Sequence, residues 1–312
     1  MTLDTRTLLE GLNSVISIPL VPFNGDQIDY NGHAKNIAYL MQNNYLSDNR
    51  PRVISIAGTS LIHHIGYDDQ IRLVEVAGQQ MGANGILIAA IVPNPLGAAS
   101  DLIDRLSKLK RPPDAYLVMP LTGVYSPQGL YRQFMQFAEK HGSEYNARFL
   151  YYLRKSADRD CVIRLLQESP HFIGIKIGTS EADVQPFVNA LDDSKIVIWG
   201  IGDRSTNAAE LGTTGHTSGI NIVVARASDE INNAQRRRDY ATARQIEAQV
   251  APLERIRFID ERAHNYAAVM AAISALGADD VVAGTGGPFN PPVPPDVAAE
   301  IQEIVADIRQ YH

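Results

Sequence analysis

The chain has 312 residues, enough for one large domain or two smaller ones, and too many for a peptide-sized or disulfide-framed fold. Hydrophobic residues make up 45% and charged residues 20%, a balance typical of folded enzymes rather than of disordered segments. The net charge of -7 gives no broad positive field, so we expect no binding to nucleic acid. Since the polar N-terminus is not followed by an apolar stretch of about 18 residues, we expect a cytoplasmic protein without membrane contact.

Short runs rich in Val, Ile and Leu recur along the chain as far as Val223, and each predicts a β-strand. They are Val15–Val21, Arg52–Ile56, Ile86–Val92, Ala115–Met119, Ala147–Leu153, Phe172–Ile177, Lys195–Gly200 and His216–Val223. Between them lie segments with helical spacing, for example Gly32–Gln42, Tyr67–Met81, Leu96–Leu109 and Gln128–His141. Strands that alternate with helices pair in parallel, and eight such units over about 225 residues predict an α/β fold, the closed (β/α)8 TIM barrel.

The remainder of the chain predicts helices only. These are Glu230–Asp260, His264–Leu276 and Pro295–Tyr311, the last introduced by a proline-rich turn. We therefore expect a catalytic barrel domain over residues 1–226, followed by a C-terminal helical extension over residues 227–312.

In a barrel of this kind the chemistry takes place at the carboxyl ends of the strands. The residues expected there are mainly hydroxyls, amides and tyrosines, and Asp203 is the single carboxylate among them. A divalent metal needs several His, Asp or Glu ligands that converge on one point. We therefore expect no metal site, and we assign no cofactor.

Lys176 is the most informative residue, because it is the one lysine of seven that lies inside an apolar run, Phe172–Ile177. Side-chain alternation places Lys176 on one face of this strand and the isoleucines on the other. If the isoleucines face the helices, the amine points into the barrel, where burial lowers its pKa and makes it a nucleophile toward carbonyl carbon. The alternative is an ion pair across the barrel. Because the other strand ends are nearly free of carboxylates, we favour the nucleophile.

Two tyrosines, Tyr151 and Tyr152, end the fifth predicted strand. Neighbouring residues of a strand point to opposite faces, so at most one of the two rings enters the barrel, and the other packs under a helix. A phenol beside a Schiff base can relay protons or hold the carboxylate of the substrate.

The segment Gly58–Ser60 follows the second predicted strand. Its hydroxyls and backbone amides form a suitable cradle for a carboxylate at a strand end. Sequences of this kind are also common in ordinary turns.

Together these residues resemble the dihydrodipicolinate synthase and N-acetylneuraminate lyase family, class I lyases of 2-oxo acids that form a Schiff base with a lysine on the sixth barrel strand. The segments that carry the resemblance are Phe172–Lys176 for the lysine, Leu150–Tyr151 for a tyrosine, Gly58–Ser60 for a carboxylate loop and Trp199–Asp203 for a Gly-Asp turn. The similarity runs nearly from end to end.

The resemblance implies a role for each matching residue. Lys176 would be the covalent nucleophile, Tyr151 the proton relay and carboxylate partner, and Thr59 with Ser60 the binders of the 2-oxo acid carboxylate. It also implies a homo-oligomer built as a dimer of dimers.

Departures from the family pattern bear on the reaction. Leu121 and Thr122 stand where synthase members have a tyrosine pair, and Ser156 falls near the arginine with which they hold a second substrate. Cleavage or dehydration of one polyhydroxylated acid needs neither feature, and Thr122 and Ser218 supply hydroxyls that suit it. We therefore expect an aldolase or a dehydratase acting on a 2-oxo acid, such as a 2-keto-3-deoxy sugar acid, rather than a dihydrodipicolinate synthase.

Further charged and titratable residues leave alternatives open. His63 and His64 follow the carboxylate loop. One of them either contacts substrate hydroxyls or donates a proton, or else these histidines begin a helix or contact another subunit. Arg154, Lys155 and Arg204 either bind a second anionic group or are solvated loop charges.

The altered loop Leu61–His64 suggests a second class of function. In that alternative the barrel has lost turnover and serves as a sensor or assembly partner for oxo acids.

Overall fold

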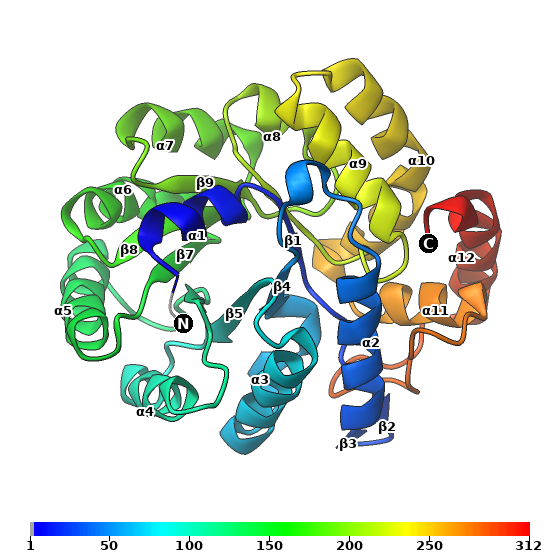
Figure 1. Cartoon of the computed structure of the whole chain (residues 1–312), viewed down its shortest axis with the longest axis horizontal. Helices are drawn as coiled ribbons and strands as arrows, with labels where there is room; N and C mark the ends of the chain where they lie inside the picture. The colour runs from blue at the N-terminus through cyan, green and yellow to red at the C-terminus, as the bar shows by residue number, and fades with distance from the viewer. Residues whose placement is uncertain (1–2) are drawn as a thin grey trace.

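The computed structural model describes residues 3–312, in which parallel strands close into a barrel (Figure 1). The strands are β1 (Val15–Ser17), β4 (Val53–Ile56), β5 (Ile86–Ile91), β6 (Ala115–Val118), β7 (Phe149–Leu153), β8 (Phe172–Ile177), β9 (Ile196–Trp199) and β10 (His216–Ser218). Strands that follow one another along the chain are neighbours, and β1 closes the ring by pairing with β10 on one side and β4 on the other. The predicted (β/α)8 fold is confirmed.

Helices surround this barrel on all sides (Figure 1). They are α2 (Tyr30–Gln42), α3 (Tyr67–Met81), α4 (Leu96–Ser107), α5 (Pro127–Tyr145), α6 (Arg159–Glu168), α7 (Val184–Ala190) and α8 (Thr206–Glu210). Parallel strands are buried on both faces, which explains why the predicted strands read as apolar runs. At the start of α5, the Ser126 side chain accepts a hydrogen bond from the backbone N–H of Gly129 at 3.1 Å.

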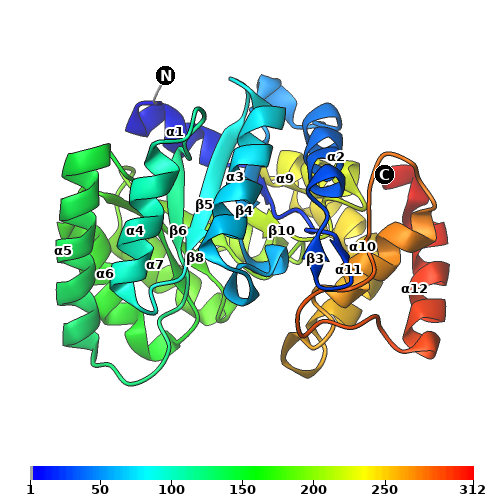
Figure 2. The same ribbon diagram turned by 90° about the horizontal axis from the view of Figure 1, so that it is seen from below.

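A short N-terminal helix that the sequence patterns did not predict, α1 (Thr5–Leu12), lies at one end of the strands (Figure 2). Leu8 and Leu12 of this helix are buried, and Gly11 packs against Ile86 at the beginning of β5. The amino end of the barrel is therefore covered, and the opposite end carries the strand termini. A small hairpin, β2 (Phe23–Asn24) with β3 (Gln27–Ile28), follows β1.

The first and last barrel strands are shorter than predicted. β1 ends at Ser17, ahead of Pro19, whose nitrogen carries no hydrogen for a strand ladder. β10 ends at Ser218, because the chain then turns and the N–H of Val223 donates to the carbonyl of Ile220 at 2.7 Å. The apolar residues of both runs are buried all the same, so apolarity alone did not mark the strand ends.

The C-terminal part consists of helices, as predicted, although their division differs. It contains α9 (Ala225–Arg236), α10 (Tyr240–Phe258), α11 (Ala267–Leu276) and α12 (Pro295–Ile308). The single helix expected over Glu230–Asp260 is two helices, because Arg238 adopts a left-handed conformation at φ 59° and Asp239 caps the new helix by accepting from Thr242 N–H at 3.1 Å. In residues 3–312 no helix combines the length and apolarity needed to cross a membrane.

A buried ion pair fastens the beginning of β4 to α9. The two Nη atoms of Arg52 donate to the carboxylate oxygens of Asp229 at 2.8 and 2.6 Å, and both side chains are 0% exposed. Arg52 Nε also donates to the carbonyl of Leu40 at 3.0 Å, next to the end of α2. Because the guanidinium is held on several sides, loss of the carboxylate leaves a buried charge without compensation.

Replacing Asp229 with alanine is therefore expected to lower the free energy of unfolding by about 3 to 5 kcal/mol, as measured by chemical denaturation. The control is Glu10→Ala, which removes the largely exposed pair with Arg6 and should cost less than about 1 kcal/mol. Equal losses in the two variants would contradict the special role of the buried pair.

Candidate active site

Lys176 lies on β8 with its side chain inside the barrel, as the alternation predicts. It is 5% exposed and lines an enclosed cavity of about 10 Å3 to which every barrel strand contributes a residue. The other members of this layer are Ile16, Ser55, Ile88, Leu117, Leu150, Ile198 and Thr217. A Cβ atom on Gly200 would lie 2.9 Å from Lys176 Cγ, so the glycine at the end of β9 makes room for the lysine stem.

The surroundings of Lys176 favour a neutral amine. Burial lowers the pKa of Lys176, the neighbouring Tyr152 opposes part of this shift, and the guanidinium groups of Arg154 and Arg257 lower the pKa further. None of the ion pairs formed within residues 3–312 includes Lys176, in contrast to the pairs of Arg52 and Arg257. The ion pair that was the alternative reading is thus not formed in this part of the chain, and the amine is suited to attack a carbonyl carbon.

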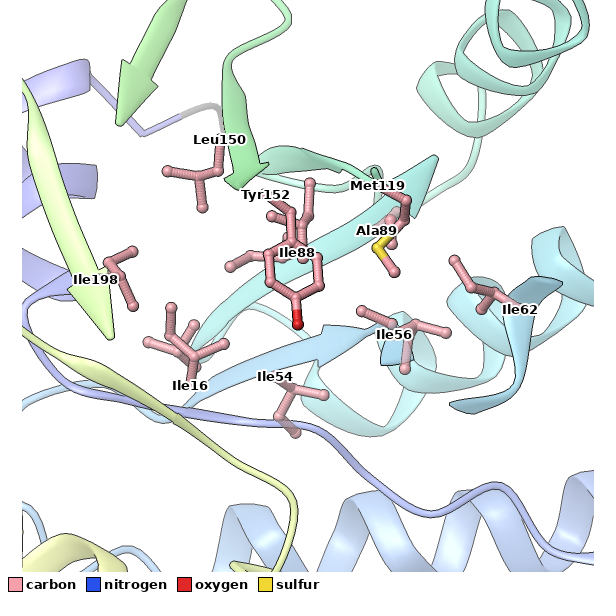
Figure 3. Packing of buried hydrophobic residues seen from close by; sticks show 14 of the residues in the cluster. Ile16, Ile54, Ile56, Ile62, Ile88, Ala89, Met119, Leu150, Tyr152 and Ile198 are labelled. Atoms are coloured by element: carbon pink, nitrogen blue, oxygen red, sulfur yellow. The ribbon is translucent and has the colours of Figure 1, made fainter. Parts of the chain in front are cut away.

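Tyr152, and not Tyr151, is the tyrosine beside this lysine. In the β7–β8 register Tyr152 lies opposite Lys176, and the Lys176 Nζ atom is 4.3 Å from the centroid of the Tyr152 ring. Figure 3 shows the Tyr152 hydroxyl pointing into the barrel. Tyr151 faces the helices and packs edge-on against Phe134 of α5, with ring centroids 5.9 Å apart. Strand alternation thus sends the Tyr151 ring away from the lysine, although Tyr151 borders the cavity at the ends of β6 and β7, and its role as proton relay stays a prediction.

Two arginines bind the hydroxyl of Tyr152. Arg154 Nη1 and Arg262 Nη1 each donate to the phenolic oxygen at 3.3 Å. Arg262 follows α10, and its Nη2 also donates to the carbonyl of Gly178 at 3.3 Å. A Cβ on Gly178 would stand 2.4 Å from the Tyr152 ring, so glycine is required for this close approach. The site thus combines a barrel tyrosine with guanidinium groups from two distant parts of the chain.

A cavity of about 430 Å3 opens at the carboxyl ends of β6 and β7, above these residues. Its lining includes His63, Thr122, Tyr125, Tyr152 and Arg154. Thr122, a predicted substrate-binding residue, thus lines the mouth of the barrel, where this cavity opens. Its backbone is held by two reciprocal hydrogen bonds with the Asn94 side chain, both 3.1 Å long. Burial lowers the pKa of His63, which favours the neutral imidazole.

The carboxylate loop is a short 3-10 turn, Gly58–Ser60, after β4, the strand directly across the closed ring from β8. Thr59 Oγ1 donates to the carbonyl of Ile18 at 3.5 Å, and Ser60 Oγ donates to that of Pro19 at 3.1 Å. Both side chains are buried. A carboxylate that binds these hydroxyls must therefore replace their hydrogen bonds to the carbonyl groups of Ile18 and Pro19, which follow β1.

Ser218 does not face the interior of the barrel. Its hydroxyl donates to Asp203 Oδ2 at 2.6 Å, accepts from the N–H of Asn221 at 2.9 Å and lies 3.1 Å from the hydroxyl of Ser228 on α9. Thr217 points inward in its place. Ser218 thus completes a fully buried network under α9, and its role in substrate binding stays a prediction.

A second ion pair, which the sequence patterns did not indicate, comes from α10. Arg257 Nη1 donates to Glu254 Oε1 at 2.5 Å, and both side chains are buried. A Cβ on Gly202 would meet Glu254, and one on Gly219 would meet Arg257, at 2.2 Å in each case, which places the pair against the ends of β9 and β10. Burial and the Asp203 carboxylate raise the pKa of Glu254 to about 7.

The sequence also missed Tyr125, a phenol in the loop after β6. Its hydroxyl donates to Asp158 Oδ2 at 2.7 Å, and Lys155 Nζ lies 4.5 Å from its ring centroid. Tyr125 lies three residues beyond Thr122, outside the positions that match the family's tyrosine pair, so the motif gave no signal for it. Arg257 lies within a predicted helix and Arg262 between two predicted helices. Neither offered a signal, because charged residues in such segments are usually solvated.

No group of three or more His, Cys, Asp or Glu side chains able to hold a metal ion occurs within residues 3–312. What converges on the mouth is an amine, phenols and guanidinium groups. This donor set suits the binding of anions and carbonyl compounds.

Comparisons with known proteins identify the family of the chain. The model of the dihydrodipicolinate synthetase family matches residues 11–308. A 4-hydroxy-tetrahydrodipicolinate synthase from Thermodesulfovibrio yellowstonii is 22% identical over 268 residues, which cover 85% of this chain and 88% of the relative.

Two solved structures share the fold. The dihydrodipicolinate synthase of Bacillus clausii superposes with a TM-score of 0.86 at 18% identity, covering 97% of this chain and 99% of the other. The chloride-inhibited synthase of Acinetobacter baumannii, solved with pyruvate, gives a TM-score of 0.81 at 19% identity and covers 95% and 98%. With the family match spanning almost all 312 residues, the chain belongs to the dihydrodipicolinate synthetase family, the class I lyases that form a Schiff base with 2-oxo acids through an active-site lysine.

Proposed function

We propose that this enzyme is an aldolase or dehydratase that acts on a 2-keto-3-deoxy sugar acid through a Schiff base on Lys176. The observation that carries the proposal is the buried, uncompensated Lys176 amine with the Tyr152 phenol against it, below an open polar cavity. The cavity offers hydroxyl, imidazole and guanidinium groups, which suit a polyhydroxylated acid.

The reaction begins when Lys176 Nζ attacks the C2 carbonyl of the acid and the carbinolamine loses water to form an iminium. The iminium withdraws electrons from C3. In aldol cleavage the C4 hydroxyl loses its proton, the C3–C4 bond breaks, and its electron pair forms an enamine that is protonated at C3 before hydrolysis releases pyruvate. In dehydration C3 loses a proton and the C4 hydroxyl leaves with its electron pair. We assign proton transfer to Tyr152, which adjoins the amine.

A second candidate is condensation of pyruvate with an aldehyde, the reaction type that the names of the relatives imply. Tyr125 in the β6 loop and Arg154 beside Tyr152 favour it, because they supply a phenol and a guanidinium although Leu121, Thr122 and Ser156 stand at the corresponding motif positions. The sequence motifs alone therefore do not exclude this reaction.

Turnover on a panel of 2-keto-3-deoxy acids, assayed alongside pyruvate with aspartate semialdehyde, tests the proposal. Release of pyruvate or of a dehydrated acid is the expected result. Efficient condensation with no lyase activity would replace the first candidate by the second. Imine formation without turnover on any of these compounds would favour the sensor.

We further propose that Thr59 and Ser60 bind the carboxylate of the 2-oxo acid. Replacing both with alanine is expected to weaken pyruvate binding by roughly 1 to 3 kcal/mol, the range for lost hydrogen bonds to a charged group. Isothermal titration calorimetry measures the change, and thermal unfolding checks that the loop at Ile18 and Pro19 is intact. Unchanged affinity in a folded variant would rule out this role.

We also infer that residues 1–226 and 227–312 act as one catalytic unit within a homo-oligomer. Val124 and Phe289 are strongly exposed apolar side chains, and both belong to loops that suit burial against another copy. Sedimentation velocity that gives only a 34.2 kDa monomer at micromolar concentration would refute the oligomer.

A further inference from the structure

We propose that Ser55 and Thr217 hold one water molecule inside the barrel, where the water accepts a hydrogen bond from the Lys176 nitrogen and positions it for the reaction. The proposal rests on the proposed function, because it gives this water a role in the Schiff-base chemistry of Lys176. Ser55 on β4 and Thr217 on β10 are then positioning residues, which the sequence motifs do not mark.

Ser55 and Thr217 lie at the same level of the barrel as Lys176. In a closed parallel barrel, every second strand contributes a side chain to one interior layer. The strand register identifies the members of this layer. Leu117 pairs with Leu150. Leu150 in turn pairs with Gly174, two residues before Lys176. Repeating this step around the ring gives the Lys176 layer, which consists of Ser55, Leu117, Lys176 and Thr217.

The Lys176 layer is unusually polar for the interior of such a barrel. Interior layers consist mainly of bulky branched residues. The four other strands contribute only apolar side chains to the same cavity, namely Ile16, Ile88, Leu150 and Ile198. In the Lys176 layer, by contrast, Leu117 is the single apolar member. Two hydroxyl groups therefore share the cavity with the lysine.

The polar groups of this layer lack good hydrogen-bond partners among residues 3–312. Ser55 Oγ is buried and bonds to none of these residues. Thr217 Oγ1 donates to the Trp199 carbonyl at 3.4 Å, longer than the range of about 2.5 to 3.0 Å for a hydroxyl donor. Lys176 Nζ takes part in no hydrogen bond within this part of the chain, whereas Lys195 Nζ donates to two carbonyl groups. Because buried polar groups are almost always paired, either with protein or with ordered water, this layer calls for a water.

The enclosed cavity between these side chains has room for one water molecule. Its volume is about 10 Å3, close to the minimum of roughly 10 to 15 Å3 that one water needs, and it is too small for a substrate. A buried water also needs about three polar partners, which Ser55, Thr217 and Lys176 supply. An apolar cavity of this size stays dry, so the two hydroxyls decide what the cavity holds.

A water in this place suits the Schiff-base reaction before and after the attack. The amine and the iminium that forms from the carbinolamine both carry an N–H, and the iminium is positively charged. The water oxygen accepts hydrogen bonds from this N–H and from the Ser55 hydroxyl, and the water donates one to Thr217 Oγ1. Because a hydrogen bond to a charged group stabilises it, the bound water favours the iminium, which is the electron sink of the reaction.

The same hydrogen bond opposes part of the lowering of the Lys176 pKa by burial. The titratable and charged groups that face Lys176 are Tyr152 on β7, Arg154 after that strand and Arg257 on α10. The other barrel strands present only uncharged side chains to the cavity. Removal of a hydroxyl leaves these three groups in place, so a change in the pH dependence of imine formation reports on the water.

A high-resolution crystal structure of the parent protein tests the water directly. We expect one ordered water within hydrogen-bond distance of Ser55 Oγ, Thr217 Oγ1 and Lys176 Nζ. Ser55→Ala should lose this water, because the cavity then keeps one hydroxyl instead of two. A parent structure without an ordered water at this place would overturn the inference, and so would a water that stays unchanged in Ser55→Ala.

Trapping of pyruvate with cyanoborohydride, followed across pH, tests the role of the water. Ser55→Ala and Thr217→Val each remove one hydroxyl with little change in shape, and each should lower the pH midpoint of the trapping rate by about half to one unit. The midpoint falls because an ammonium group that loses a hydrogen-bond acceptor gives up its proton more readily. Thr217→Ser, which keeps the hydroxyl, should retain the midpoint of the parent protein.

Ser14→Ala is the matched control. Ser14 Oγ is also buried and bonds to none of residues 3–312, but this serine precedes β1, near the covered end of the barrel. Its substitution should leave the midpoint unchanged. A midpoint that stays constant in Ser55→Ala, or that falls equally in Ser14→Ala, would contradict a role for the water at Lys176.

The two experiments together separate this inference from the proposed function. Trapping at Lys176 in a parent protein whose barrel holds no such water leaves the Schiff-base function standing and refutes the water site. An ordered water at the three side chains, without trapping at any pH, refutes the Schiff-base function. In that case the water belongs to the packing of the barrel alone, and its role in the reaction is refuted as well.

Discussion

Replacement of Lys176 with alanine is expected to abolish covalent trapping of pyruvate and to lower kcat/KM by roughly a thousandfold or more, as for loss of a catalytic nucleophile. The physical reason is the position of the amine: burial lowers its pKa, so more of it is neutral at pH 7 than for an exposed lysine with a pKa of about 10.4. Borohydride reduction in the presence of pyruvate, followed by peptide mass spectrometry, locates the adduct.

Lys195 provides the matched control. Burial lowers the pKa of Lys195 as well, but its amine donates to the carbonyl groups of Ser169 and Phe172, at 2.7 Å in both cases, near the amino ends of β8 and β9. Lys195→Met should therefore leave the adduct in place. An adduct that persists in Lys176→Ala, or that lies on Lys195, would contradict the assignment.

The second large effect concerns the two neighbouring tyrosines. Tyr152→Phe is expected to lower kcat by roughly 10²- to 10⁴-fold, the range for loss of a positioned acid or base, because its hydroxyl lies inside the barrel beside Lys176. Tyr151→Phe should change kcat little, since the ring that packs against Phe134 is retained. Steady-state kinetics on the best acid of the panel measures both.

This pair of variants also decides between two ways of assigning a residue. The family motif pointed to Tyr151, whereas the strand register places Tyr152 opposite Lys176. A large loss in Tyr151→Phe with little change in Tyr152→Phe would mean that the motif was the better guide. Because both substitutions remove one hydroxyl and keep the ring, differences in packing do not obscure the comparison.

The fold was predictable because a parallel barrel buries its strands on both faces, so each one appears as an apolar run. Lys176 was predictable for the same reason. A charged residue within such an apolar run is buried, and burial of a charge is costly unless the residue has a particular role. The choice between Tyr151 and Tyr152 was not predictable from the sequence. It depends on the pairing of β7 with β8, whose register shifts between Phe149 and Leu150. A shift of one residue exchanges the two faces of a strand.

Ser218 and Arg262 show a second limit of prediction from local sequence patterns. The hydroxyl of Ser218 is at a strand end, yet its partners on α9 and in the loop at Asp203 are not visible in the local pattern. Arg262 reaches Tyr152 across 110 residues of chain. Contacts of this range depend on how the C-terminal helices dock on the barrel, and no local periodicity encodes that docking.

The pairing of β1 with β10 has a consequence for biosynthesis. The hydroxyl of Ser17 donates a hydrogen bond to Asn221, 204 residues later. The first strand of the barrel therefore cannot pair with the last one until the ribosome has synthesised the chain through β10. Until then β1 and the growing edge of the sheet present unpaired N–H and C=O groups, which favours association with other chains. Contacts between distant residues also slow folding. Nascent chains of this protein should therefore depend on chaperones more than a helical bundle of equal length would. A circular permutant that begins between β1 and β4, with the original termini joined, would shorten the separation between β1 and β10 along the chain.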